Sequence, residues 1–325
     1  MAGIPCYYCL FPVLLMAIII CERSANLLHI TSYLGLPFGH ALISFVDITT
    51  SSDSQLFLDP CLIERGADAL SKQASALIAD FEDKLYADMR YGNWHSTPIF
   101  NEAHEVNDTK LGYGNGRNGK GKTPRGMRDS LNGLCELANG IPSISRIQDI
   151  SVFVEDFAED CMSDLLTNIL RLVLCQFTAE QMQFYGKQPA GRHQIKSWDC
   201  STHDWIETEQ PFWTVEGRKV LLVPKWWVRK HFLFKAHQYL YGVIIERMKK
   251  GSGYDDLSKK DVWRNMERDS EHWEYNKVIE YTRENPDALK EYHNRMPRYY
   301  DRANGCMDDD ALDETIYGYR VIETA

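Results

Sequence analysis

Residues 111–123 read Leu-Gly-Tyr-Gly-Asn-Gly-Arg-Asn-Gly-Lys-Gly-Lys-Thr, a stretch that core, helix face or linker does not explain. Each glycine loses more conformational entropy on folding than any other residue, so a folded domain rarely keeps such a run without a use for it. Cations surround the glycines at Lys110, Arg117, Lys120, Lys122, Arg125 and Arg128. Backbone N–H groups together with flexible cations form a nest for an anion, most often a phosphate. The stretch therefore predicts a phosphate-gripping loop.

The phosphate-binding residues of this loop are predicted to be Gly116, Gly119, Lys120, Gly121, Lys122, Thr123 and Arg125. Residues 116–123 match the pattern GxxxxGK[ST] and so resemble the Walker A loop of P-loop NTPases. That resemblance implies that Lys122 meets the nucleotide phosphates and that Thr123 binds Mg²⁺. Residues 150–156 similarly resemble a Walker B strand that ends in an acid. A P-loop leaves a buried strand, whereas residues 105–113 are polar, so a nucleotide-binding NTPase is an alternative interpretation.

Composition and charge favour a folded enzyme over a general nucleic-acid-coating protein. The 325 residues are 44% hydrophobic, which is ample for a core, and the formal net charge is −10. A coating protein would need a basic surface for most of its affinity. Here the cations concentrate in 110–128 and 218–235. A focused positive cleft on an acidic body suits an enzyme that acts on a phosphorylated substrate.

The cysteines and the N-terminus bear on localisation. Nine cysteines cannot all pair, and several stand in apolar or helical contexts, which is typical of reduced thiols and of a cytoplasmic protein. Residues 6–21 are apolar and uncharged but are interrupted by Pro12 and short for a membrane span. No Lys or Arg precedes the run, as a signal peptide would require. A membrane partner is therefore not expected, although the apolar segment 1–26 leaves secretion or anchoring open.

The expected fold class is α+β, with a small mixed sheet packed against helices. The sheet is expected to hold a hairpin over 41–59 and buried strands near 150–155 and 219–223. The remaining segments are expected as helices over 67–90, 126–138, 157–175 and 226–250, and as loop over 186–212. Gly251-Ser-Gly253 is the clearest linker. It divides a main domain, 27–250, from a charged helical C-terminal appendage, 254–325.

Carboxylates cluster where the expected strand 150–155 runs into a helix. Asp160 and Asp164 are four residues apart and so share a helix face, and Asp156 stands with Glu155 at the end of the expected strand before them. A pair of like charges at this spacing is only mildly destabilising on an exposed helix, but together with Glu155 and Asp156 the pair forms a carboxylate cluster that suits a bound Mg²⁺ or Mn²⁺. Asp156, Asp160 and Asp164 are the predicted metal ligands. Complementation of the helix dipole by N-terminal acids is the plainer alternative.

The loop and the acids together predict a metal-assisted phosphoryl or phosphodiester hydrolase, with a nuclease-like enzyme as one form of it and a nucleic acid or nucleotide as substrate. Lys122 and Lys225 are the cations expected nearest the reacting phosphate, and Glu105 is the expected acid or base before the loop. A non-enzymatic protein that binds a protein or nucleic-acid partner through the loop is a further alternative, because exposed aromatic residues on the C-terminal helices also suit binding.

Overall fold

The computed structural model describes residues 28–92, 94–104, 107–113, 123–155, 157, 159–251 and 256–319. Its helices are α2 (Ile30–Leu34), α3 (Pro60–Arg65), α4 (Ala69–Arg90), α5 (Pro124–Ser130), α6 (Asn132–Gly140), α7 (Ile147–Phe153), α8 (Glu159–Ile169), α9 (Arg171–Phe184), α10 (Ala236–Tyr239), the π-helical segment η3 (Leu240–Ile244), α11 (Ile245–Gly251), α12 (Lys259–Asn265), α13 (Trp273–Glu284), α14 (Pro286–Arg302) and α15 (Asp309–Tyr317). Its strands are β1 (Phe57–Leu58), β2 (Gly191–Asp199), β3 (Asp204–Val215), β4 (Arg218–Val220) and β5 (Val228–Arg229). Within these residues helices predominate over two small antiparallel sheets, which confirms the α+β class.

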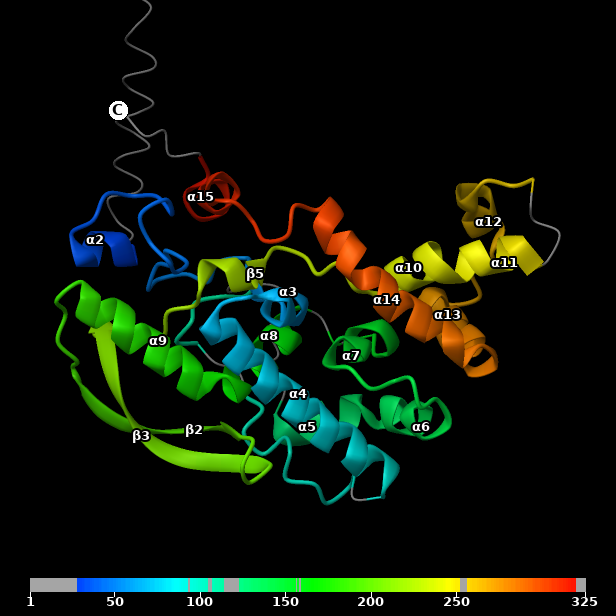
Figure 1. The fold of residues 1–325 in the computed structure, drawn as a ribbon, viewed down its shortest axis with the longest axis horizontal. Helices are drawn as coiled ribbons and strands as arrows, with labels where there is room; N and C mark the ends of the chain where they lie inside the picture. The colour runs from blue at the N-terminus through cyan, green and yellow to red at the C-terminus, as the bar shows by residue number, and fades with distance from the viewer. Residues whose placement is uncertain are drawn as a thin grey trace, which may run out of the picture.

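The long amphipathic helix expected over 67–90 is confirmed as α4. Asp68 caps it by accepting a hydrogen bond from the amide of Ser71 at 2.9 Å. On its apolar face, Ala74, Phe81 and Leu85 are fully buried. Figure 1 shows α4 and α9 lying above the β2–β3 hairpin. No helix in the described part of the chain is both long and apolar enough to cross a membrane.

The first two strands of the three-stranded sheet occupy a segment that the sequence predicts to be loop. β2 and β3 pair antiparallel with Trp198 opposite Trp205, and β4 continues the sheet beside β3. The two indole rings lie edge to face at 5.5 Å, and Trp198 also meets Phe81 of α4 at 5.0 Å. The prediction of a loop over 186–212 is therefore wrong. Helices cover only one face of the hairpin, so its strands keep many polar residues and carry a weak strand signal.

The buried strand expected near 150–155 is also wrong, because residues 147–153 form α7. Asp149 starts this helix by accepting hydrogen bonds from the amides of Ser145 and Arg146, both at 2.9 Å. Every residue of α7 is buried. A short run that is buried on all sides fits a buried strand and a buried helix equally well, and periodicity alone does not separate the two.

The hairpin expected over 41–59 is replaced by long-range pairing. Only Phe57–Leu58 forms a strand there, and it pairs with β5. The amide of Val46 donates to the carbonyl oxygen of Val223 at 3.0 Å, and the amide of Ser54 donates to the carbonyl oxygen of Lys110 at 2.8 Å. The backbone hydrogen bonds of this segment are thus made with distant segments, and the local sequence pattern does not reveal such partners.

The strand expected over 219–223 is confirmed only at its start, as β4. After β4 the amide of Leu221 donates to the carbonyl of Asp108, and that of Leu222 donates to the hydroxyl of Thr178. The single helix expected over 226–250 is wrong in its first third, because residues 228–229 form β5 and the helix begins at Ala236. Hydrogen bonds to neighbouring elements decide these boundaries.

The C-terminal helices are tied to the main body through buried polar contacts. The hydroxyl of Tyr300 in α14 donates to both carboxylate oxygens of Asp59, at 2.9 and 2.7 Å. Asp313 in α15 accepts from the ring of His40 at 2.6 Å. Figure 1 shows α14 and α15 running along the top of the molecule above α3 and α7. The C-terminal region is therefore anchored at both α14 and α15.

Candidate functional site

The glycine-rich loop leaves the body of the protein at Leu111, Gly112 and Tyr113, which are called the loop base below. The amide of Gly112 donates to the carbonyl oxygen of Ser54 at 2.9 Å. Leu111 is buried and forms an isolated parallel bridge with Ser54. These contacts fix the point from which the loop starts. Residues 114–122 lie outside the described residues.

The loop base contacts the N-terminal end of α8. A Cβ atom built on Gly112 would lie only 2.8 Å from Oδ1 of Asp160, closer than real Cβ atoms approach a neighbour. Gly112 also has a φ of +145°, which residues with a side chain rarely adopt. Glycine is thus required at this position for two reasons. Asp160, one of the three predicted metal ligands, lies directly against the loop base.

A second contact joins the loop base to the residue before Asp160. The hydroxyl of Tyr113 donates to Oε2 of Glu159 at 2.9 Å, and its ring packs on Phe57 at 4.8 Å between centroids. Oε1 of Glu159 forms an ion pair with the ammonium group of Lys235, and Nδ1 of His231 lies 3.7 Å from the same oxygen. A carboxylate, a phenol, an ammonium group and an imidazole therefore gather beside the loop base.

The protonation states in this cluster follow from its geometry. Burial alone would raise the pKa of Glu159, but the hydrogen bonds from Lys235 and Tyr113 outweigh it, so the pKa lies below its ordinary value. Burial and the adjacent Glu159 carboxylate raise the pKa of the Tyr113 phenol. Glu159 is consequently an anion at neutral pH, and Tyr113 is a neutral donor.

His231 and Lys235 were not among the residues that the sequence singled out. Their partner Glu159 lies more than seventy positions earlier in the chain, and no spacing motif links such distant positions. The expected helix over 226–250 also kept these residues from being predicted as part of a site, because it would place His231 and Lys235 on a helix surface. Their side chains are 64% and 42% exposed, so both can still meet a ligand that approaches from solvent.

The remaining predicted residues are distributed as follows. Glu105, Gly116, Gly119, Lys120, Gly121, Lys122 and Asp156 lie outside the described residues. Thr123 caps α5, where its hydroxyl accepts from the amide of Gly126 at 3.1 Å. Arg125 is exposed and lies 3.7 Å from Asp129. Asp164 stands one turn after Asp160 on α8. Within the described residues, no three or more His, Cys, Asp or Glu side chains are grouped as a metal site.

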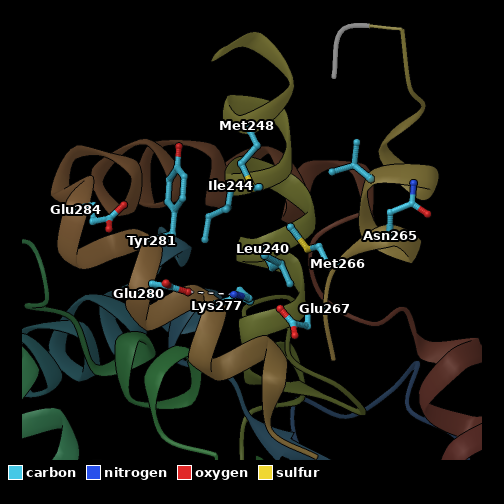
Figure 2. Close-up of a pocket in the computed structure, with 11 residues that line it drawn as sticks. Leu240, Ile244, Met248, Asn265, Met266, Glu267, Lys277, Glu280, Tyr281 and Glu284 are labelled. Atoms are coloured by element: carbon cyan, nitrogen blue, oxygen red, sulfur yellow. Dashed lines mark hydrogen bonds and ion pairs between the residues drawn. The ribbon is translucent and has the colours of Figure 1, made fainter. Parts of the chain in front are cut away.

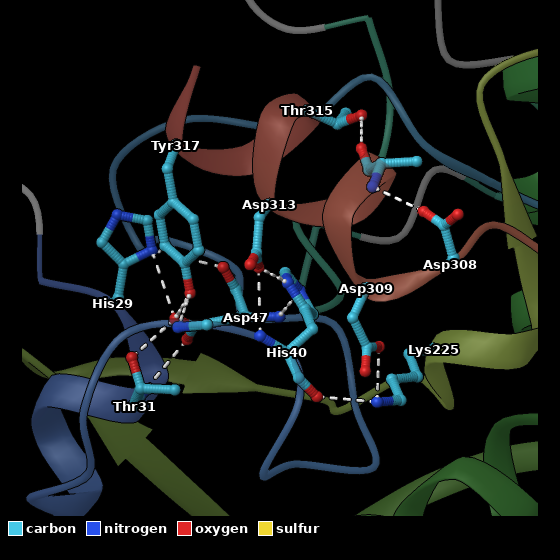
Figure 3. Close-up of polar contacts among 12 residues, drawn as sticks. His29, Thr31, His40, Asp47, Lys225, Asp308, Asp309, Asp313, Thr315 and Tyr317 are labelled. Atoms are coloured by element: carbon cyan, nitrogen blue, oxygen red, sulfur yellow. Dashed lines mark hydrogen bonds and ion pairs between the residues drawn. The ribbon is translucent and has the colours of Figure 1, made fainter. Parts of the chain in front are cut away.

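Lys225 belongs to a different cluster, shown in Figure 3. Its ammonium group donates to the carbonyl oxygen of His40 and to Asp309 of α15, both at 2.6 Å. These partners place Lys225 beneath the acidic C-terminal helix and not among the contacts of the loop base. The structure therefore does not bring the predicted catalytic Lys225 together with Asp160.

The histidine of this second cluster is held in a structural role. Nε2 of His40 accepts from the amide of Asp47 at 3.1 Å, so Nδ1 carries the proton and donates to Asp313 at 2.6 Å. Burial lowers the pKa of His40. Asp47 in turn accepts hydrogen bonds from Thr31 and from the hydroxyl of Tyr317, as Figure 3 shows. Both nitrogens of His40 are engaged within the fold, which leaves neither to act as a catalytic base.

An apolar cavity lies elsewhere, among the C-terminal helices. Its volume is about 300 Å³, at the lower end of ordinary ligand pockets. Figure 2 shows Leu240, Ile244 and Met248 along one helical wall, with Ile244 facing Tyr281 on α13. The structure thus contains two candidate sites, a polar one at the loop base and an apolar one between helices.

The fold and the loop base define the chain as an α+β protein with a glycine-rich, cationic loop beside an acidic helix end. A family comparison extends this description: the chain belongs to the family described as Domain of unknown function (DUF8370), which matches residues 38–235. This segment includes the loop base, α8, His231 and Lys235, whereas the apolar cavity lies beyond it. No curated protein and no solved structure matches the chain.

Proposed function

We propose that this chain is a metal-assisted phosphoryl or phosphodiester hydrolase, whose phosphate-gripping loop opens at the acidic end of α8. The contact between Gly112 and Asp160 carries the proposal. It joins the start of the glycine-rich loop to a carboxylate on a helix, and a loop that holds phosphate beside a carboxylate that holds a cation is the pairing that phosphoryl hydrolysis needs.

Asp160 is the first metal ligand in this proposal. Mg²⁺ commonly binds through one or two protein carboxylates together with substrate phosphate oxygens, so a complete cage of protein ligands is not required. Asp164, one turn later, and Asp156, from the sequence, are the other candidates. The bound cation would polarise the phosphoryl group and supply hydroxide from water at neutral pH.

The cations at the loop base contribute electrostatic stabilisation in this proposal. Negative charge spreads over the phosphoryl oxygens in the transition state, and fixed positive groups stabilise it. Lys120 and Lys122 supply such charge from the loop sequence. Lys235 supplies it from the body, where Glu159 holds its ammonium group in place. Lys225 takes no part, because its bonds to Asp309 and to the carbonyl of His40 hold it in the second cluster and not at the loop base.

The substrate class follows from the same charges. A cationic loop on a chain with a net charge of −10 suits a nucleotide or a nucleic-acid strand that is gripped at one or a few phosphates. The P-loop NTPase alternative receives less support. Residues 107–113 contribute only an isolated bridge before the loop, and within the described residues the sheets are antiparallel.

Hydrolysis assays with the purified full chain test the proposal. Bis(4-nitrophenyl) phosphate, single-stranded DNA and RNA are incubated with Mg²⁺ or Mn²⁺. We expect metal-dependent cleavage that falls at least tenfold in Asp160→Asn. Asp83→Asn, which changes an exposed acid on α4, is the matched control and should keep full activity. Cleavage that is unchanged in Asp160→Asn would refute the proposed site.

Two further results distinguish the alternatives. Stabilisation of the full chain by Mg²⁺-ATP in a thermal shift assay, without cleavage of any phosphodiester, would favour the nucleotide-binding interpretation, because a ligand bound only to the folded state raises apparent stability. Binding of oligonucleotides with no cleavage under any metal condition would favour a non-enzymatic binding protein.

A further inference from the structure

The apolar cavity of Figure 2 is independent of the loop base and of the proposed hydrolase. It is formed by η3, α11, α12 and α13, after the segment that the family matches. Leu240 and Val262 are buried in its wall, and Met248 and Met266 are partly exposed. Methionine side chains are flexible and polarisable, so a wall that contains two of them adapts to ligands of varied shape.

One wall of the cavity is a π-helical segment that the fold supports specifically. Such segments are rare and frequently stand at functional sites. The carbonyl of Gly242 accepts a hydrogen bond from Nη1 of Arg295 at 2.6 Å. A Cβ atom on Gly242 would lie 2.6 Å from the hydroxyl of Tyr299. Glycine at this position and an arginine from α14 therefore keep the widened helix in place.

The rim of the cavity is acidic. Three glutamates line it, Glu267, Glu280 and Glu284, against the single lysine Lys277. The ammonium group of Lys277 lies 3.1 Å from Glu280, and Figure 2 shows this ion pair at the edge of the cavity. Glu267 and Glu284 form no ion pair within the described residues. The cavity thus has an apolar interior below an excess of negative charge.

We propose that this cavity binds an organic cation, an ammonium or guanidinium group carried on a hydrocarbon or aromatic body. The apolar body fills the space between Leu240, Met248 and Val262, and gains free energy by leaving water. The positive group remains at the rim, where Glu267 and Glu284 attract it. The ring of Tyr281 gives an ammonium group a further attractive surface. An anionic amphiphile of the same size is disfavoured by the same charges.

Methyl NMR of the full chain tests the proposal at the cavity itself. The chain is labelled with ¹³C at the methionine methyl groups, and the signals of Met248 and Met266 are assigned with Met→Leu variants. Octyltrimethylammonium, octanol and octanoate are titrated below the concentrations at which they form micelles. We expect saturable shifts of both signals, with the cation bound at least tenfold more tightly than octanoate and several-fold more tightly than octanol.

Charge variants separate the rim from the interior. Glu267→Gln combined with Glu284→Gln should bring the affinities for octyltrimethylammonium and octanol to within about twofold of each other, because the interior is unchanged. Glu271→Gln, an exposed acid that does not line the cavity, should leave the preference intact.

Three outcomes would overturn the proposal. One is octanoate or octanol binding as tightly as the cation, and another is the absence of shifts at both methionines with every ligand. The third is a basic amphipathic peptide of leucine and lysine shifting the signals of Met248 and Met266 where octyltrimethylammonium does not, which would assign the cavity to a protein partner.

Discussion

Replacement of Asp59 by asparagine tests how the C-terminal helices are held to the body. Asp59 caps α3 by accepting from the amide of Cys61 at 2.8 Å, and it accepts two hydrogen bonds from Tyr300 of α14. It is completely buried. Burial raises the pKa of Asp59 from 3.8 to about 6, although the hydrogen bonds from Tyr300 and Cys61 act in the opposite direction.

The sign of the pH dependence follows from this pKa. Folded Asp59 holds its proton more tightly than the unfolded chain does, so its contribution to stability is full below pH 3.8 and is lost as the pH rises through about 6. The whole span corresponds to about 3 kcal/mol, of which about 1.3 kcal/mol falls between pH 5 and pH 7. Asparagine does not titrate and caps a helix as well as aspartate does. Asp59→Asn should therefore lose this part of the pH dependence.

Urea unfolding followed by circular dichroism at pH 5 and pH 7 measures the difference. The free energy of unfolding of the unchanged chain should fall between these pH values by about 1.3 kcal/mol more than that of Asp59→Asn. Burial raises the pKa of Glu82 to about 8, but Glu82 is present in both proteins and its effect cancels. Asp83→Asn should behave as the unchanged chain does. If the free energy of unfolding of Asp59→Asn changed with pH as that of the unchanged chain does, the raised pKa of buried Asp59 would be refuted.

Two further substitutions test the loop base and the second polar cluster. Gly112→Ala should lower the free energy of unfolding by about 1–3 kcal/mol, because of its φ and its closeness to Asp160; Gly140→Ala, which meets no atom within 4 Å, should be neutral or slightly stabilising in the same urea titration. Lys225→Gln should cost about 0.5–1.5 kcal/mol through its lost bonds to Asp309 and the carbonyl of His40, and should leave phosphate-ester cleavage unchanged. A neutral Gly112→Ala would contradict the close contact, and a tenfold loss of cleavage in Lys225→Gln would return Lys225 to the catalytic residues.

The features that the sequence predicts correctly depend on local periodicity and composition. The apolar residues of α4 recur every three or four positions, and that spacing suffices for an amphipathic helix whatever it packs against. The α+β class follows in the same way from the mixture of helical and strand-like segments. Local spacing alone also pointed to Asp160, which lies against the base of the glycine-rich loop, while its role as a metal ligand stays a prediction.

Tertiary contacts decided the remainder, because these choices depend on partners that are distant in sequence. Residues 147–153 are buried on every side, so their surroundings selected helix over strand. The hairpin of β2 and β3 is held by Trp198 against Phe81 of α4. Glu159 forms an ion pair with Lys235 that only the tertiary fold brings about. Lys225 forms an ion pair with Asp309 of α15. Local sequence thus determined which segments are amphipathic helices, whereas long-range hydrogen bonds and ion pairs determined which charged residues share a site.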